Sequence, residues 1–304
     1  METFRVHILG CGSATPTLRH NCTTQVVEIR GKLFMIDCAE GAQKMLLETK
    51  INHNRINTIF ISHLHGDHCF GLIGLICTMG MTGRTAPLHI YAPQELNEIL
   101  DRLIDFFAAG LEFKVVFHQV DTTQSTVIYD DRSLNVTTIP LNHRVPCCGF
   151  LFIEKPTLPH IRREMIDFYH IPFSQINNIK CGQDWVTEEG EVVFNSRLVI
   201  PADPPRSYAY CSDTKYMPQL VNLLKNVNLL YHESTYTDDK MENAAKYHHS
   251  TGSQAATIAK MANAKMLLLG HFSASTNEQI LLQQAQAIFE NTLLAKEGIV
   301  VDVK

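Results

Sequence analysis

Residues 62–68 read SHLHGDH, which places three histidines and an aspartate within six consecutive positions. The stretch directly follows TIFIS (58–62), a short apolar run typical of a strand that is buried on both faces. Gly66 lets the chain turn sharply at the sheet edge, so several of these side chains can point at one place. Imidazole and carboxylate groups are good ligands for zinc and similar cations. The stretch therefore predicts a metal site rather than a set of solvated loop histidines.

More ligands are expected at other strand ends, because one loop cannot supply the ligands of two metal ions. Three candidates have that placement, and they are His143 after LNVTTIPLN, Asp213 after SYAYCS and His271 after KMLLLG. Each residue alone would be weak evidence for a metal site, since His and Asp at strand ends commonly cap a neighbouring element or form other hydrogen bonds. Together, with one for each β segment, they fit a single site.

Length and composition describe an ordinary globular protein. The 304 residues, of which 45% are hydrophobic, can bury a large core. The start METFRVHILG lacks the features of a secretory signal, and no apolar run approaches the roughly 20 residues that span a bilayer. We therefore expect a cytoplasmic protein with no membrane partner. The formal charge of −5 provides no global basic field for nucleic acid, which leaves only a local basic patch for such a partner.

The nine cysteines are scattered along the chain, with Cys147 and Cys148 adjacent and no CxxC pair. This distribution predicts neither a disulfide framework nor a cysteine zinc site. We expect reduced thiols that are mostly buried.

The turn GCGSAT (10–15) superficially resembles a dinucleotide-binding loop. Its third glycine is missing, and the element that follows is predicted to be a strand rather than a helix. We therefore expect no nucleotide cofactor here, and interpret the segment as a glycine-rich turn beneath the metal loop.

Strand and helix patterns alternate in both halves of the chain. Strands are predicted at 4–9, 23–30, 33–38, 58–62, 88–93, in the β-rich stretch 112–154, and at 207–212, 227–233, 265–270 and 298–303. Helices are predicted at 40–49, from 67 or 68 to 80, and at 95–107, 219–226, 253–262 and 277–292. Two β-rich sheets, each flanked by helices, indicate the α/β (α+β) class and a four-layer αββα sandwich with the helices outside.

One polar stretch, at about 156–199, interrupts this alternation with a short predicted helix (162–169) and a hairpin around EEGE (188–191). No linker is apparent on either side. We therefore predict a single domain over residues 1–304 with an inserted arm at about 156–199.

Several short motifs occur in a fixed order over the whole chain. They are GCGSATP (10–16), SHLHGDHCFGL (62–72), the strand-end His143, CSDT (211–214), HST (249–251) and GHFS (270–273). Together they resemble the ribonuclease Z family of the metallo-β-lactamase superfamily. The resemblance implies the αββα metallo-β-lactamase sandwich with two zinc ions at one edge of the sheets, for which Mn²⁺ can substitute.

The resemblance also implies a role for each residue of the motifs. One metal ion would be held by His63, His65 and His143, the other by Asp67, His68 and His271, and Asp213 would bridge them. Asp67 would also accept a proton from the attacking water, and His249 would protonate the leaving ribose oxygen. Glu233, in YHEST, would orient His249. Without the resemblance, His249 reads as a surface histidine beside His248.

The implied activity is that of a homodimeric hydrolase, an endoribonuclease that removes the 3′ trailer from precursor tRNA and leaves a 3′-hydroxyl on the tRNA. Two segments depart from the family pattern. The predicted arm keeps Arg162, Arg163 and Lys180 but lacks a Gly-Pro pair, and HFS is followed by 274–276 (AST), where many members have Arg and Tyr. Because of these departures, the arm can also be interpreted as a polar surface insertion that has no binding partner.

Two other functions remain open at this point. One is a metallo-β-lactamase-fold hydrolase of a small phosphodiester or thioester. The other is a metal-binding or RNA-binding protein that has lost catalysis.

Overall fold

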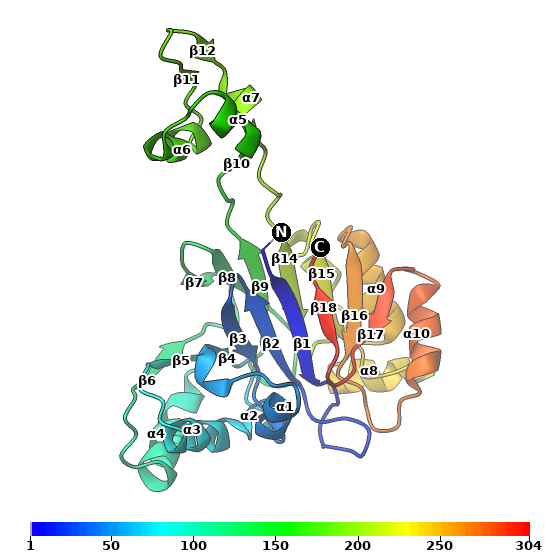
Figure 1. Cartoon of the computed structure of the whole chain (residues 1–304). Coiled ribbons are helices and arrows are strands. Elements are labelled where there is room, and N and C mark those ends of the chain that lie inside the picture. The colour runs from blue at the N-terminus through cyan, green and yellow to red at the C-terminus, as the bar shows by residue number, and fades with distance from the viewer. Residues whose placement is uncertain (1) are drawn as a thin grey trace. The chain divides into compact units, whose positions relative to one another are not determined.

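Two seven-stranded mixed sheets form most of the structure, a computed structural model that describes residues 2–304 (Figure 1). The first sheet has the order β18 (Val300–Asp302), β1 (Phe4–Gly10), β2 (Thr24–Ile29), β3 (Lys32–Ile36), β4 (Ile56–Phe60), β5 (Leu88–Ala92) and β6 (Val115–Gln119). The second has the order β17 (Thr292–Leu294), β16 (Met266–Gly270), β15 (Leu229–Glu233), β14 (Ser207–Cys211), β9 (Cys148–Glu154), β8 (Leu134–Pro140) and β7 (Val127–Asp130). Strands β3 to β6 run parallel to one another, as do β14 to β17, so their carboxyl ends meet at common edges.

Large side chains from both sheets fill the space between them. Phe60 of β4 packs against Phe150 and Phe152 of β9, with ring centroids 5.2 and 5.6 Å apart. All three rings are fully buried. Aromatic rings of this size contribute much apolar area, so the two sheets are held face to face.

Helices cover the outer faces of both sheets. The larger part of the chain contains α1 (Ala42–Glu48), α2 (Gly66–Cys69), α3 (Leu72–Met81), α4 (Glu95–Phe107), α8 (Met241–Tyr247), α9 (Gly252–Met261) and α10 (Glu278–Gln286), with the 3₁₀ helices η1 (His53–Arg55), η2 (Pro218–Asn222) and η3 (Asp238–Lys240). Apolar residues of α1, α3 and α4 pack on the first sheet, and buried alanines of α9 pack on the second. Helices α3 and α4 lie on one side of the sheets and α9 and α10 on the other (Figure 1). The predicted four-layer αββα arrangement is confirmed.

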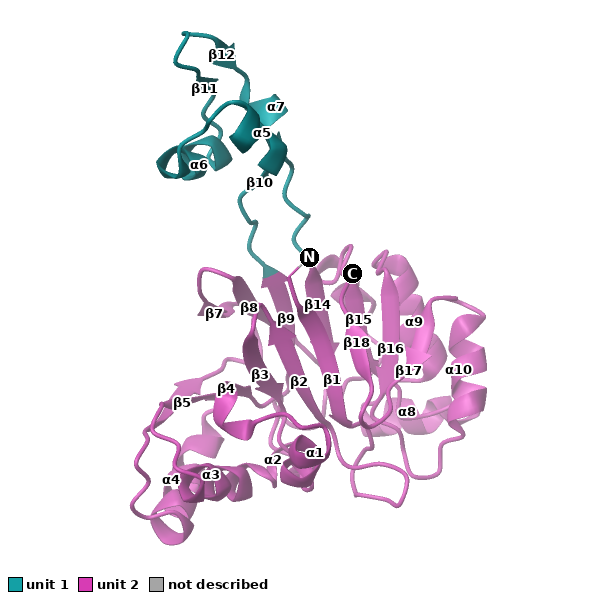
Figure 2. Cartoon of the chain, viewed as in Figure 1, with its two compact units in different colours: residues 1, 154–205 teal, residues 2–153, 206–304 magenta. Residues whose placement is uncertain are grey.

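Contacts divide the chain into two compact units, one made of residues 2–153 with 206–304 and the other of residues 154–205 (Figure 2). The smaller unit contains β10 (His160–Ile161), α5 (Arg163–Phe168), α6 (Phe173–Lys180), β11 (Trp185–Val186), β12 (Val192–Val193), α7 (Asn195–Leu198) and β13 (Val199–Ile200). It has a small core of its own around Ile171, Ile179, Val193 and Leu198. The inserted arm predicted at about 156–199 falls inside this unit, and its description as part of a single domain stays a prediction.

Some local predictions were wrong. The helix predicted from 67 or 68 to 80 is two helices, α2 and α3. The helix predicted at 219–226 is the shorter 3₁₀ helix η2, which begins at Pro218. The helix predicted at 277–292 ends at Gln286, because Thr292–Leu294 pairs with β16 as β17. In each case a tertiary contact or a local breaker overrode the apolar periodicity.

No helix among residues 2–304 combines the length and the apolar composition that crossing a bilayer requires.

The close approach of β9 and β14 generates a stability prediction. A Cβ atom added at Gly149 would lie 2.2 Å from the carbonyl oxygen of Tyr210, which is backbone and cannot rotate away. We expect Gly149→Ala to lower the free energy of unfolding by about 2–3 kcal/mol. Urea unfolding followed by circular dichroism measures this change.

Gly74→Ala in α3 is the matched control, because the nearest atom to its added Cβ is the flexible Gln43 side-chain nitrogen at 3.1 Å. Alanine favours a helix, so this variant should lose no stability and should gain up to about 1 kcal/mol. Equal losses in the two variants would contradict the close-approach explanation.

Candidate active site

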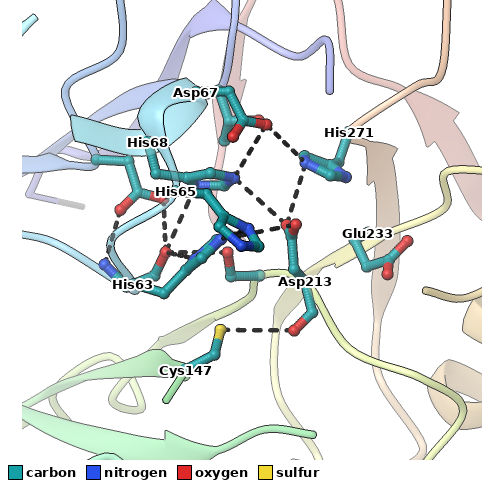
Figure 3. A network of polar contacts seen from close by, with 12 residues as sticks. His63, His65, Asp67, His68, Cys147, Asp213, Glu233 and His271 are labelled. Carbon is teal, nitrogen blue, oxygen red and sulfur yellow. Dashed lines mark hydrogen bonds and ion pairs between the residues drawn. The ribbon is translucent and has the colours of Figure 1, made fainter. Parts of the chain in front are cut away.

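All seven predicted metal ligands lie together at one edge of the larger unit. Figure 3 labels all of them except His143. Four of them follow β4 closely, with His63 and His65 in the loop before α2 and Asp67 and His68 in α2 itself. The other three, His143, Asp213 and His271, follow the carboxyl ends of β8, β14 and β16. The packing of the two sheets therefore brings together side chains that are up to about two hundred positions apart.

Three histidines and one oxygen of Asp213 form the first ligand group. The Nδ1 atom of His65 lies 3.2 Å from Nε2 of His63 and 3.2 Å from Nε2 of His143. The Oδ2 atom of Asp213 lies 3.7 Å from the same two Nε2 atoms. Ligands about 2.0 Å from a tetrahedral zinc ion are about 3.3 Å from one another, so these four atoms fit such an ion.

The other oxygen of Asp213 faces a second ligand group, formed by Asp67, His68 and His271. Asp213 Oδ1 lies 3.4 Å from His68 Nε2 and 3.1 Å from His271 Nε2, while Asp67 Oδ2 lies 3.6 Å from both nitrogens. Among the described residues, Asp213 Oδ1 and the two Nε2 atoms are buried and find no hydrogen-bond partner. Burying a polar atom without a hydrogen-bond partner lowers the stability of the fold, and a bound cation would supply the missing interaction.

Four of the ligand histidines, all except His65, are oriented by hydrogen bonds at their opposite ring nitrogen. In these four Nδ1 is engaged and Nε2 faces the ligand group, whereas His65 faces its group with Nδ1. The partners are Ser62 Oγ for His63 (3.0 Å), Asp37 Oδ2 for His68 (2.7 Å), the His248 carbonyl for His143 (3.0 Å) and Thr235 Oγ1 for His271 (3.0 Å). This arrangement is the usual one for metal-binding histidines, because it selects the tautomer and holds the ring.

Asp37, at the carboxyl end of β3, is a residue that sequence reasoning missed. Its buried Oδ2 atom accepts hydrogen bonds from His68 Nδ1 (2.7 Å), the Ser62 hydroxyl (2.9 Å) and the Tyr210 hydroxyl (2.6 Å). Its Oδ1 atom accepts from the Ser62 backbone N–H at 2.7 Å. The available signal was the same as for the other residues of the site, a polar side chain at the end of an apolar strand.

The electrostatics of the first group favour metal binding. Burial lowers the pKa of His63 and His65, and lowers the pKa of His143 to about 4. These imidazoles are therefore neutral near pH 7 and have a free lone pair. Burial acts to raise the pKa of Asp213, but the nearby charges of His271 and His68 outweigh it, so this carboxylate is ionised.

Glu233, at the end of β15, holds His249. Its Oε1 atom accepts from His249 Nδ1 at 3.0 Å and from the Ser250 N–H at 3.0 Å, while Oε2 accepts from the Thr235 hydroxyl at 2.9 Å. Burial acts to lower the pKa of His249, and the charge and hydrogen bond of Glu233 raise it above its ordinary value. The HST motif places this histidine because Thr251 caps α9 through the N–H of Gln254.

A cavity of about 450 Å³ opens at the ligand groups. Asp67, Asp213, His249 and His271 line it, and so do Arg144 and Phe70, which sequence reasoning missed. Arg144 directly follows a predicted ligand, and the exposed ring of Phe70 packs over Gly66, where a Cβ atom would lie 2.3 Å from the ring. The structure thus brings together every residue predicted for the site, with an open space beside them.

Comparisons with known proteins match this site and fold. A family model described as Anti-Pycsar protein Apyc1 matches residues 4–158, which excludes Asp213, His249 and His271. The full chain is 55% identical over 304 residues to a protein named Ribonuclease Z from Bacteroides fragilis, with 100% of both chains covered.

Solved structures extend the comparison to the fold. Human tRNase Z, short form, superimposes with a TM-score of 0.73 at 26% identity, covering 99% of both chains. The metallo-β-lactamase fold protein YhfI from Bacillus subtilis superimposes with a TM-score of 0.70 at 18% identity, covering 99% of this chain and 100% of the other. The likeness to YhfI concerns the fold alone. Both the predicted fold and the predicted family are confirmed, and the chain belongs to the ribonuclease Z family of metallo-β-lactamase-fold proteins.

Proposed function

We propose that this protein is a metal-dependent endoribonuclease that removes the 3′ trailer from precursor tRNA and leaves a 3′-hydroxyl on the tRNA. One observation carries the proposal. Two four-atom ligand groups share Asp213 beside an open cavity, in a chain that is 55% identical over its full length to a protein named Ribonuclease Z. We expect the protein to act in the cytoplasm, where the precursor tRNA of its bacterial relatives is made.

The ions are proposed to be two zinc ions per subunit, for which Mn²⁺ can substitute. His63, His65 and His143 would hold one ion, Asp67, His68 and His271 the other, and Asp213 would bridge them. Nitrogen and carboxylate ligands in these spacings suit zinc. When bound, a pair of divalent cations lowers the pKa of water and neutralises charge that develops on the phosphate.

Asp67 is proposed as the proton acceptor for the attacking water. Burial acts to raise the pKa of Asp67, but the nearby charges of His271 and His68 lower it below its ordinary value. The N–H of Ala14 donates to Asp67 Oδ2 at 2.6 Å and holds the carboxylate in place. A carboxylate with a low pKa is a weak base, so the negative charge of Asp67 contributes to catalysis alongside its role as proton acceptor.

His249 is proposed as the acid that protonates the leaving ribose oxygen, with Glu233 as its positioning residue. The bond from Nδ1 to Glu233 leaves the other ring nitrogen, Nε2, available to substrate, and His249 lines the cavity. The raised pKa of His249 keeps more of the imidazole protonated at neutral pH.

Contacts to RNA are proposed at two places. At the cavity, Arg144 would pair with a backbone phosphate and the exposed Phe70 would stack on a base. In the smaller unit, Arg162, Arg163 and Lys180 would contact tRNA locally. That unit carries five Lys and Arg against eight Asp and Glu, so it offers RNA no overall positive field.

We also propose a homodimer, on the resemblance to the family. Large apolar side chains are exposed on α3 and at the end of α4, where Met81, Phe106 and Phe107 are 79%, 81% and 63% exposed. Exposed apolar side chains that gather in this way mark interaction surfaces, and here the partner would be a second copy of the chain.

Cleavage of a defined RNA tests the proposed activity. We expect the zinc-loaded protein to cut a 3′-extended tRNA transcript once and to leave a 3′-hydroxyl, and Asp67→Ala to abolish the cut. Gel analysis and end-labelling measure both. Turnover of a small phosphodiester such as bis(p-nitrophenyl) phosphate without any cut in the transcript would replace the nuclease with a small-substrate hydrolase.

Replacing Asp37 tests the proposed ligand arrangement. Asp37→Asn removes the negative charge that faces His68 Nδ1, so we expect metal affinity to fall about 10–100-fold. Metal analysis after titration with a chelator measures this fall. Tyr210→Phe is the control, since it removes one hydrogen bond to Asp37 and keeps the charge. Unchanged affinity in Asp37→Asn would contradict the role of His68 as a ligand.

A substrate with sulfur as the leaving atom tests His249. On ordinary precursor tRNA, His249→Ala should lower kcat about 10²–10⁴-fold. A thiolate leaves without being protonated, so a bridging phosphorothiolate at the scissile bond should restore most of this loss. Single-turnover kinetics measure both substrates.

Two variants serve as controls for the sulfur experiment. His248→Asn keeps a residue that tolerates the positive φ of 59° and should cleave both substrates normally. Asp67→Ala should cleave neither substrate, because the sulfur leaving atom does not replace the function of Asp67. If His249→Ala loses as much rate on the sulfur substrate as on the normal one, His249 is not the acid.

A further inference from the structure

A second cluster of metal-ligating groups lies outside the catalytic residues. Cys11 Sγ is 3.3 Å from His20 Nδ1 and 3.6 Å from Glu297 Oε1, and His20 Nδ1 is 3.3 Å from the same Oε1 atom. Cys11 is fully buried, His20 is 8% exposed, and the Glu297 side chain is 14% exposed. The three residues belong to the turn after β1, the loop before β2 and the segment before β18.

These spacings match those of ligands around one small cation. With sulfur about 2.3 Å and nitrogen or oxygen about 2.0–2.1 Å from a tetrahedral zinc ion, neighbouring ligand atoms are about 3.3–3.6 Å apart. The carbonyl oxygen of Ala295 lies 3.6 Å from Cys11 Sγ and offers a fourth ligand.

The opposite side of the His20 ring supports the same assignment. His20 Nε2 lies 3.0 Å from Glu278 Oε1, at the start of α10, and Glu278 is itself paired with Arg19 at 3.1 Å. A carboxylate on one ring nitrogen directs the lone pair of the other nitrogen toward the metal. His20 is therefore held as the ligand histidines of the catalytic site are held.

A cavity of about 650 Å³ gives solvent and ions access to this cluster, because His20 and Glu297 both line it. Polar and charged groups, including Arg19, Asn21, Lys44 and Glu48, line the same cavity. The cluster is thus buried but lies beside a route by which an ion can arrive.

We propose that Cys11, His20 and Glu297 form a structural site for one zinc ion, separate from the catalytic pair. Binding replaces the S–H bond of Cys11 with a sulfur–zinc bond and releases the proton to solvent. His20 contributes a neutral nitrogen and Glu297 a carboxylate oxygen, and no electron is transferred.

This ion would brace the edge of the catalytic site. The carbonyl of Cys11 accepts the N–H of Phe272, the residue after His271, at 2.9 Å. Three residues beyond Cys11, Ala14 donates to Asp67. An ion that holds Cys11 and His20 together therefore also holds the loop between them. This loop contacts the proposed ligand Asp67 directly, and it contacts Phe272, the neighbour of the proposed ligand His271.

Cobalt substitution tests the site with a signal that the catalytic pair cannot produce. The catalytic ligands are all nitrogen and oxygen, so a near-ultraviolet sulfur-to-cobalt charge-transfer band reports a cysteine ligand alone. We expect this band in the fully loaded Co²⁺ protein, together with about three ions per chain by metal analysis. Cys11→Ser should abolish the band and leave about two ions per chain.

Two further variants make the result decisive. Cys22→Ser changes a buried cysteine that lines the catalytic cavity, and it should keep the band. Glu297→Gln keeps an oxygen that can accept the Asn21 N–H but weakens metal binding, so it should reduce the band even if Cys11→Ser fails to fold. Circular dichroism checks the fold of each variant.

Wild-type protein with a loaded catalytic pair but no sulfur band would overturn the proposal. The cluster would then be a hydrogen-bonded network in which a protonated His20 joins two glutamates. A band that persists in Cys11→Ser and disappears in Cys22→Ser would also overturn it, by assigning the sulfur to the catalytic cavity.

Discussion

Asp213 is the residue on which the rest of the site depends. Each of its carboxylate oxygens faces a different ligand group, with Oδ2 toward His63 and His143 and Oδ1 toward His68 and His271. A buried carboxylate surrounded by imidazoles is costly unless the charges around it are balanced. The proposed pair of cations would provide that balance, and the sheets must hold β4, β8, β14 and β16 in place for the ligand groups to form.

Each sheet also contributes one buried carboxylate that orients a proposed ligand through hydrogen bonds on the side away from the ligand groups. Asp37, at the end of β3, binds His68, while Glu233, at the end of β15, binds Thr235, which in turn contacts His271. Glu233 has a second task, because it also binds His249. The same carboxylate thus links His271, a proposed metal ligand, to the proposed acid, so a change at Glu233 would disturb both the ligand geometry and the proton transfer.

Much of the architecture could be predicted from the sequence because its signals are local. The apolar runs of β1, β4, β14, β15 and β16 are short and bounded, and they were located within a few residues. Helix ends were predicted less well, since η2 is a short 3₁₀ helix that begins at Pro218, and α10 ends before the segment that pairs as β17. The residues that face RNA in the proposed function, Arg144 and Phe70, carry no pattern of their own and appear only when the cavity is seen.

The sequence by itself determined the fold class, the family and the seven candidate ligands, because each ligand follows a recognisable strand and four of them share one loop. Only the tertiary structure decided which oxygen of Asp213 faces each ligand group, and which buried groups orient the ligands. It alone brought Cys11 and His20 beside Glu297, across more than 270 positions of the chain. The physical reason is that a ligand cage depends on distances between side chains of different elements, and these distances exist only once the two sheets have packed.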